Sequence, residues 1–132
     1  RDVLQVVRDQ RGAPTWARLI AEVTAVALRQ LDGGRASDTR WGTYHLAASG
    51  STTWYDYACY IIEGSHGRGA PLRTGADAVT PILARDYPSA AARPANSMLD
   101  TAKLRDTFSL QLPDWQDGVN RVLDQLLVGH LQ

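Results

Sequence analysis

VLQVVRDQRGAPTWARLIAEVTAVALRQL, residues 3–31, decides the fold class because its apolar pattern changes from that of a strand to that of a helix. Residues 3–7 are a short apolar run without alternation, typical of a strand covered on both faces of a parallel sheet. After a polar loop, Thr15 is a plausible N-cap of an amphipathic helix that Gly33 and Gly34 end. Its apolar stripe comprises Trp16, Leu19, Ile20, Val23, Val26, Ala27 and Leu31.

The next segment predicts a second strand and a second helix. Residues 42–48 have the composition of a strand and lead into a turn at residues 49–52, which would complete a β–α–β unit. Thr53 and Asp56 fit a loose capping box at the start of a helix that Gly64 closes.

The second half of the chain predicts shorter elements. They are a strand at residues 78–80 stopped by Pro81, a long loop over residues 82–94, a brief edge strand at Met98 and Leu99, a helix from Asp100 to Thr107, and a last helix from Pro113 to Gly129. No repeat or low-complexity linker separates these pieces. The expected fold class is α/β, with two parallel strands of a Rossmann-like sheet and a small α+β lobe.

Composition limits the function classes. The 132 residues suffice for one domain, and 14 Lys and Arg balance 14 Asp and Glu. Nucleic acid is not an expected partner, because neutralising a phosphate backbone needs surplus positive charge. No apolar run is long enough to span a membrane. With Cys59 as its single cysteine, the chain is expected in a reducing, cytoplasmic compartment.

The predicted sheet is too small to stand alone. Two parallel strands leave both outer edges unpaired and bury little apolar surface. The sequence begins with Arg1, and its only methionine is Met98. We therefore expect the first strand to continue a larger sheet, supplied by residues upstream or by another chain.

Familiar catalytic patterns are missing from the sequence. His45, His66 and His130 are scattered and Cys59 is alone, so no metal site is expected. There is no G-x-S-x-G motif. Residues 64–69 are glycine-rich but follow a helix and lack the P-loop lysine. No catalytic residue is expected in this chain.

Asp9 and Gln10 belong to the first of three polar clusters that could bind a ligand. They follow the first strand, and ligands of α/β sheets dock beyond the carboxyl ends of strands. Their side chains could hydrogen-bond a polar ligand, or Asp9 could simply cap the turn.

The other two clusters combine an aromatic or an arginine with turn residues. Trp54 and Tyr57 follow the expected second strand; an aromatic there could stack on a base, but core packing is favoured because both lie on the apolar stripe. Arg93 is presented by Pro94, beside Asn96 and Ser97, and arginine suits phosphate oxygens. The alternative for Arg93 is an ion pair with Asp86 or Asp100.

Together these clusters resemble one family. VVRDQRGAPT at residues 6–15, GTYHL at 42–46 with TWYDYA at 53–58, RPANSMLD at 93–100 and LPDWQDGV at 112–119 are similar to the C-terminal part of the dTDP-4-dehydrorhamnose reductases, extended short-chain dehydrogenases/reductases. The resemblance is collinear and covers nearly the whole chain. It implies that residues 1–64 complete the sheet and residues 65–132 form the substrate lobe.

The resemblance also implies a reaction. In that family NADPH or NADH passes hydride to the 4-keto group of dTDP-4-dehydro-L-rhamnose, using a Gly-rich turn and a Tyr-x-x-x-Lys motif in the N-terminal portion. Neither is present here, and the only lysine is Lys103. This chain alone is thus expected to be inactive and to need the N-terminal domain. Mg²⁺ as a further cofactor and a homodimer as the assembly both remain to be tested.

Within this resemblance, the substrate-binding candidates are Arg93 toward the phosphates, Asn96 beside it, and Asp9 and Gln10 near the strand ends. The alternative function is a non-catalytic binding subunit of the same fold, similar to the regulatory subunit of methionine adenosyltransferase.

Overall fold

The computed structural model describes residues 3–31, 38–88, 91 and 93–127. Its central pairing is parallel: β1 (Leu4–Val7) lies beside β4 (Val79–Ile82), with Leu4 opposite Val79 and Val7 opposite Ile82. A short antiparallel pair follows, between β2 (Arg11–Gly12) and β3 (Thr52–Thr53). The expected α/β class with a parallel strand pair is confirmed.

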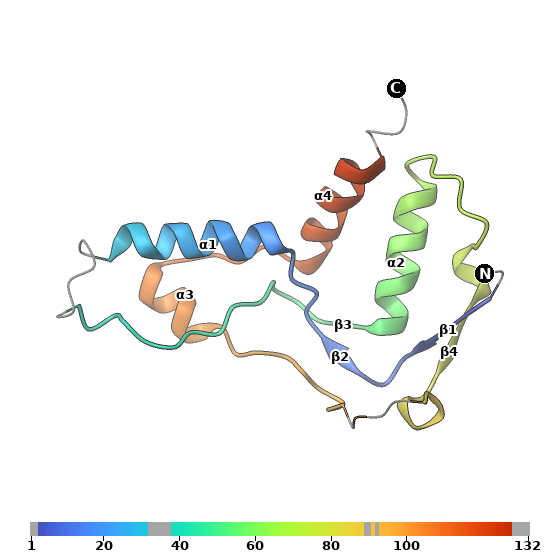
Figure 1. The fold of residues 1–132 in the computed structure, drawn as a ribbon, viewed down its shortest axis with the longest axis horizontal. Coiled ribbons are helices and arrows are strands. Elements are labelled where there is room, and N and C mark those ends of the chain that lie inside the picture. The colour runs from blue at the N-terminus through green and yellow to red at the C-terminus, as the bar shows by residue number, and fades with distance from the viewer. Residues whose placement is uncertain (1–2, 32–37, 89–90, 92, 128–132) are drawn as a thin grey trace.

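Four helices accompany these strands within the described residues. They are α1 (Ala17–Gln30), α2 (Trp54–His66), α3 (Ala102–Phe108) and α4 (Trp115–Leu127). Two 3-10 turns flank β4, η1 (Ala76–Ala78) and η2 (Ala84–Asp86). In Figure 1, α1 lies over α3, while α2 and α4 stand beside each other and α2 covers the β1–β4 pair.

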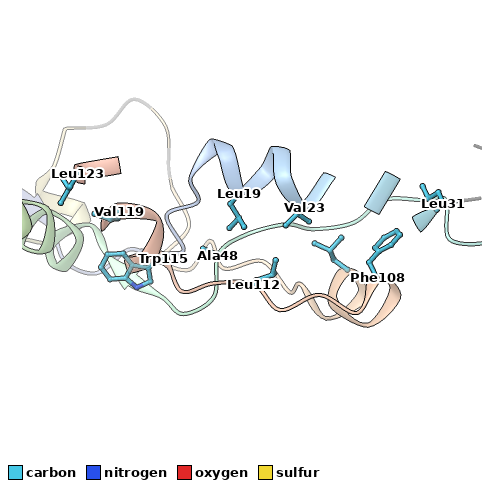
Figure 2. Close-up of a cluster of buried hydrophobic side chains, with 10 residues drawn as sticks. Leu19, Val23, Leu31, Ala48, Phe108, Leu112, Trp115, Val119 and Leu123 are labelled. Atoms are coloured by element: carbon cyan, nitrogen blue, oxygen red, sulfur yellow. The ribbon is translucent and has the colours of Figure 1, made fainter. Parts of the chain in front are cut away.

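The buried core cluster is built mainly by helix residues rather than by strand residues. Leu19 and Val23 of α1 face Leu112 and the Phe108 ring, which is 2% exposed (Figure 2). The same cluster continues through Trp115, Val119 and Leu123 of α4 toward α2. This continuous core joins α1 to α4.

The expected strand at residues 42–48 is wrong. This segment forms no strand, and the parallel partner of β1 is β4 instead. Its apolar residues are buried for another reason: Tyr44 packs on Phe108 with ring centroids 5.2 Å apart, and Ala47 and Ala48 lie in the interior. The Ala48 N–H donates to the Thr15 hydroxyl, so side chains rather than a ladder hold the segment.

Several element boundaries also differ from those expected. Thr15 does not cap α1, whose N-cap is Trp16, because the Thr15 hydroxyl donates to the Ala13 carbonyl. Pro81 lies inside β4, which is an edge strand of its two-stranded sheet, where a missing N–H is tolerated. α2 runs through Gly64 to His66.

Two further expectations concern residues 98–99 and the helix ends. Met98 and Leu99 form no strand; the nearby pairing is an isolated bridge between Asn96 and Arg11. The stops expected at residues 33–34 and 129 lie outside the described residues. The capping box is confirmed, because the Thr53 hydroxyl accepts from the Asp56 N–H.

Candidate functional site

A large hollow opens beyond the carboxyl ends of β1 and β4. Its volume is about 730 Å³, within the usual range of small-molecule sites. We call it the larger hollow; it is lined by Gln5, Val6, Val7, Gln10, Trp54, Ala84, Arg85, Tyr87, Ala91 and Arg93. β1, the start of α2 and the η2 turn therefore all contribute to its wall.

Arg93 reaches this wall because the backbone that follows it is tied to β2. The Arg11 N–H donates to the Ala95 carbonyl at 2.8 Å, and the Ser97 N–H donates to the Arg11 carbonyl at 2.9 Å. The ion pair expected as the alternative is not formed: among the described residues, Arg93 joins neither Asp86 nor Asp100, and Asp86 lies 3.7 Å from Arg85. The Arg93 guanidinium is thus able to bind an anion, whereas that of Arg85 already forms an exposed ion pair with Asp86.

Gln10 lies between β1 and β2 and lines the larger hollow, as the sequence suggested. Asp9 is used differently, because its Oδ1 accepts a hydrogen bond from the Ala84 N–H at 2.8 Å. That bond fixes the first residue of η2, which carries Arg85. Asp9 therefore supports the wall of the hollow, in line with the alternative of a turn-capping role.

Asn96 also makes a local bond. Its Oδ1 accepts from the Met98 N–H at 3.0 Å, and its backbone forms the bridge to Arg11. Of the four predicted binding residues, the structure brings Gln10 and Arg93 into one hollow, while Asp9 and Asn96 shape the segments that carry it.

A smaller hollow adjoins the larger one. Its volume is about 250 Å³, and the two share Gln10 and Trp54. No charged side chain contributes to its lining, which comprises Gln10, Gly12, Ala13, Pro14, Thr15, Leu46, Ala47, Thr52, Thr53, Trp54, Tyr57, Ser97 and Leu99. The hydroxyls of its threonines and its serine each donate to a protein acceptor: Thr15 to Ala13, Thr52 to the Thr53 carbonyl, Thr53 to Asp56, and Ser97 to Arg11.

The two aromatics of the second cluster have separate roles. Tyr57 packs against Trp115 with centroids 5.9 Å apart, which confirms the core-packing expectation for Tyr57. Trp54 instead stays 50% exposed and lines both hollows. The sequence could have indicated this, because Trp54 is the first helical residue after the Thr53 cap.

Sequence reasoning also missed Arg85 and Tyr87. They follow β4 in a segment that was expected to be a long loop, and their place in the wall depends on the β1–β4 pairing. Tyr55 lies one residue beyond Trp54 but outside both linings. Its pKa is raised above that of free tyrosine, chiefly by a side-chain hydrogen bond with Cys59.

The described residues form no cluster suited to a metal ion. Within those ranges no three His, Cys, Asp or Glu side chains gather closely enough to hold an ion such as Mg²⁺. Lys103 is occupied structurally, since its Nζ donates to the Thr43 carbonyl and lies 4.6 Å from the centre of the Tyr44 ring. The printed sequence has no Tyr-x-x-x-Lys motif.

No helix in the described part of the chain is long and apolar enough to cross a membrane. A hollow at the carboxyl ends of parallel strands is the arrangement of ligand-binding α/β domains. The class of protein defined by the fold is therefore an α/β ligand-binding domain.

The family model described as RmlD substrate binding domain matches residues 1–128, and the chain belongs to this family. It is 47% identical over 126 residues to a dTDP-4-dehydrorhamnose reductase of Escherichia coli K12, covering 96% of this chain and 40% of that protein. The chain thus spans about two fifths of the length of this curated relative.

Solved structures agree on the fold. A dTDP-4-dehydrorhamnose reductase of Bacillus anthracis in complex with NADP superposes with a TM-score of 0.75 at 28% identity, covering 95% of this chain and 39% of that one. An orthologue from Clostridium acetobutylicum gives 0.77 at 27% identity, with 96% and 39% coverage. The predicted family and its partial coverage are both confirmed.

Proposed function

We propose that this chain is the nucleotide-sugar-binding part of a reductase that converts dTDP-4-dehydro-L-rhamnose to dTDP-L-rhamnose with NADPH or NADH. The observation that carries the proposal is the larger hollow, whose lining includes both Arg85 and Arg93 together with residues that follow β1 and β4. Guanidinium groups bind phosphate oxygens through paired, charge-assisted hydrogen bonds. A sugar diphosphate supplies such oxygens.

The chain's own residues would bind and orient the substrate. Arg93 would neutralise the diphosphate, and Gln10 would hydrogen-bond the nucleotide sugar at the strand ends. Asp9 would act by holding η2 through Ala84, and Asn96 by shaping the turn after Arg93; a direct substrate contact of either side chain stays a prediction. Orientation of this kind lowers the barrier by fixing the reacting group near its partner.

Hydride and proton transfer are assigned to the rest of the complete protein. The cofactor, when bound there, supplies the hydride. In this proposal residues 1–64 belong with the sheet-forming half and residues 65–132 form the substrate lobe. The exception is β4, which lies within residues 65–132 but joins the sheet. The N-terminal domain is then an obligatory partner, and the cytoplasm is the expected compartment. Dependence on Mg²⁺ and assembly into a homodimer stay predictions.

The test uses the complete protein. Arg93→Ala should raise the KM for the nucleotide sugar tenfold or more, because charge-assisted hydrogen bonds contribute about 1.5–3 kcal/mol. The KM for NADPH should stay within about twofold. Arg73→Ala is the matched control, since Arg73 is exposed and lines neither hollow.

Equal effects of Arg93→Ala on both KM values would refute the assignment of Arg93. Binding of dTDP-sugar with no NADPH oxidation by the complete protein would favour the non-catalytic binding subunit instead.

A further inference from the structure

Arg68 follows α2 and joins it to α4 through one guanidinium group. Its Nη1 donates to the Gly64 carbonyl of α2 at 2.9 Å, and its Nε donates to the Asp124 carboxylate of α4 at 2.6 Å. Its Nη2 also donates to the side-chain oxygen of Asn120 at 3.3 Å. The Arg68 side chain is only 25% exposed, so solvent screens these bonds less than those of a fully exposed pair. We call this set of bonds the Arg68 bridge.

The Arg68 bridge continues through aromatic side chains to the candidate site. The Asn120 Nδ2 donates to the Tyr60 hydroxyl at 2.9 Å, and the Tyr60 ring meets Trp115 edge-on with centroids 5.0 Å apart. Trp115 in turn packs against Tyr57, which lines the smaller hollow. An unbroken series of contacts thus joins the far end of α2 to the wall of that hollow.

Apolar packing leaves α4 incompletely supported on α2. The two helices approach closely at Gly64, where an added Cβ would lie 2.9 Å from the Leu123 Cδ1. A third hollow of about 270 Å³ opens beside Ile61 of α2 and Val122 of α4, and Tyr57 lines both this hollow and the smaller one. Unfilled volume offers few contacts that resist a shift of α4. The polar bonds of the Arg68 bridge therefore carry more of the task of fixing α4.

We propose that Arg68 is a positioning residue for the substrate site, because it fixes α4 against α2 and so holds Trp115 against Tyr57 in the wall of the smaller hollow. Arg68 itself lines neither hollow of the site. Without the bridge, α4 shifts into the third hollow and Trp115 no longer supports Tyr57. The fraction of molecules with the binding geometry then falls, and the apparent affinity falls in proportion. This inference rests on the proposed function and adds to it a residue that acts from outside the hollows.

The test measures steady-state kinetics of the complete protein at a temperature below the onset of unfolding of every variant. Arg68→Ala should raise the KM for the nucleotide sugar about threefold to tenfold, while kcat and the KM for NADPH stay within about twofold. Tyr60→Phe should raise the same KM, since it removes only the hydroxyl that Asn120 reaches. In the double variant the two effects should be less than additive, because both changes interrupt one series of contacts.

Arg18→Ala is the matched control. Arg18 also pairs with a carboxylate through its Nε, 2.8 Å from Glu22, but both residues belong to α1. It lines none of the three hollows. Its replacement should leave both KM values unchanged.

Tyr60→Phe keeps the aromatic ring, so it decides the case if Arg68→Ala does not fold. An unchanged KM for the nucleotide sugar overturns the positioning role, as does strict additivity of the two changes. A loss of stability and kcat without a change in that KM overturns it too, because a merely structural bridge would give that result. If Arg93→Ala still raises the KM for the nucleotide sugar alone, the proposed function stands without this inference. Failure of the unsubstituted complete protein to turn over the nucleotide sugar overturns both.

Discussion

The backbone N–H and the hydroxyl of Ser97 both donate to the carbonyl oxygen of Arg11, each at 2.9 Å. These bonds join two segments 86 residues apart in sequence. Because Gln10 precedes Arg11 and Arg93 lies four residues before Ser97, the same junction brings the two predicted binding residues to one hollow. The candidate site therefore depends on a contact that carries no ligand itself.

The Ser97–Arg11 junction can be tested with Gly12. A Cβ added at Gly12 would lie 2.9 Å from the Ser97 Oγ, too close for an unshifted side chain. Gly12→Ala should lower the free energy of unfolding of the complete protein by about 1–3 kcal/mol. Ser97→Ala alone should cost about 1 kcal/mol.

The two changes should not be additive. In Gly12→Ala with Ser97→Ala the close contact is gone, so the loss should be smaller than the sum by about 0.5 kcal/mol or more, measured by urea unfolding. Strict additivity would show that Gly12 and Ser97 do not interact in this way.

Substitutions of Asp9 can distinguish structural support of η2 from direct contact with the ligand. Asp9→Asn keeps an acceptor oxygen for the Ala84 N–H, whereas Asp9→Ala removes it. We expect Asp9→Ala to weaken dTDP binding several-fold and to lower stability by about 1 kcal/mol, while Asp9→Asn preserves most of both. A large loss of affinity in Asp9→Asn, with stability intact, would instead indicate that the carboxylate charge acts on the ligand.

Gly50 and Gly69 form a matched pair with nearly equal left-handed backbones, at φ 77° and 76°. A Cβ at Gly50 would lie 3.3 Å from the Trp115 Cδ1, whereas nothing lies within 4 Å of one at Gly69. Gly69→Ala should cost about 1 kcal/mol of stability from backbone strain alone. Gly50→Ala should cost more, and a smaller cost at Gly50 would contradict tight packing against Trp115.

Phe108 tests the core that joins α1 to α3. It is 2% exposed and packs on Tyr44. Phe108→Ala should reduce the free energy of unfolding by about 3–5 kcal/mol, because it removes a buried ring and leaves a cavity. Leu126→Ala, at a residue 60% exposed, should change it by less than about 0.5 kcal/mol. Similar effects at the two positions would refute this account of the core.

The helices were the most predictable elements because their signals are local. The stripe from Leu19 to Leu31 indicated α1, and Thr53 with Asp56 indicated the start of α2. β1 was also recognisable, since four successive residues of strand composition need no distant information. The polar residues after β1 and around Arg93 marked the neighbourhood of the hollow for the same reason.

The partner of β1 depended on tertiary structure. Residues 42–48 and β4 both have apolar strand composition, and Pro81 made β4 look like a segment that stops. What separates them is packing: Ala48 is buried in the core and Tyr44 packs against it, whereas β4 pairs with β1. Composition reports that a residue is buried and does not report which element covers it.

The sequence by itself determined the helical framework, the α/β class and the polar residues after β1. Tertiary structure alone decided that Gln10, Trp54, Arg85 and Arg93 share one hollow. The physical reason is that hydrophobic periodicity and capping act over a few residues, whereas this hollow forms only when strand pairing and the Ser97–Arg11 bonds bring distant segments together.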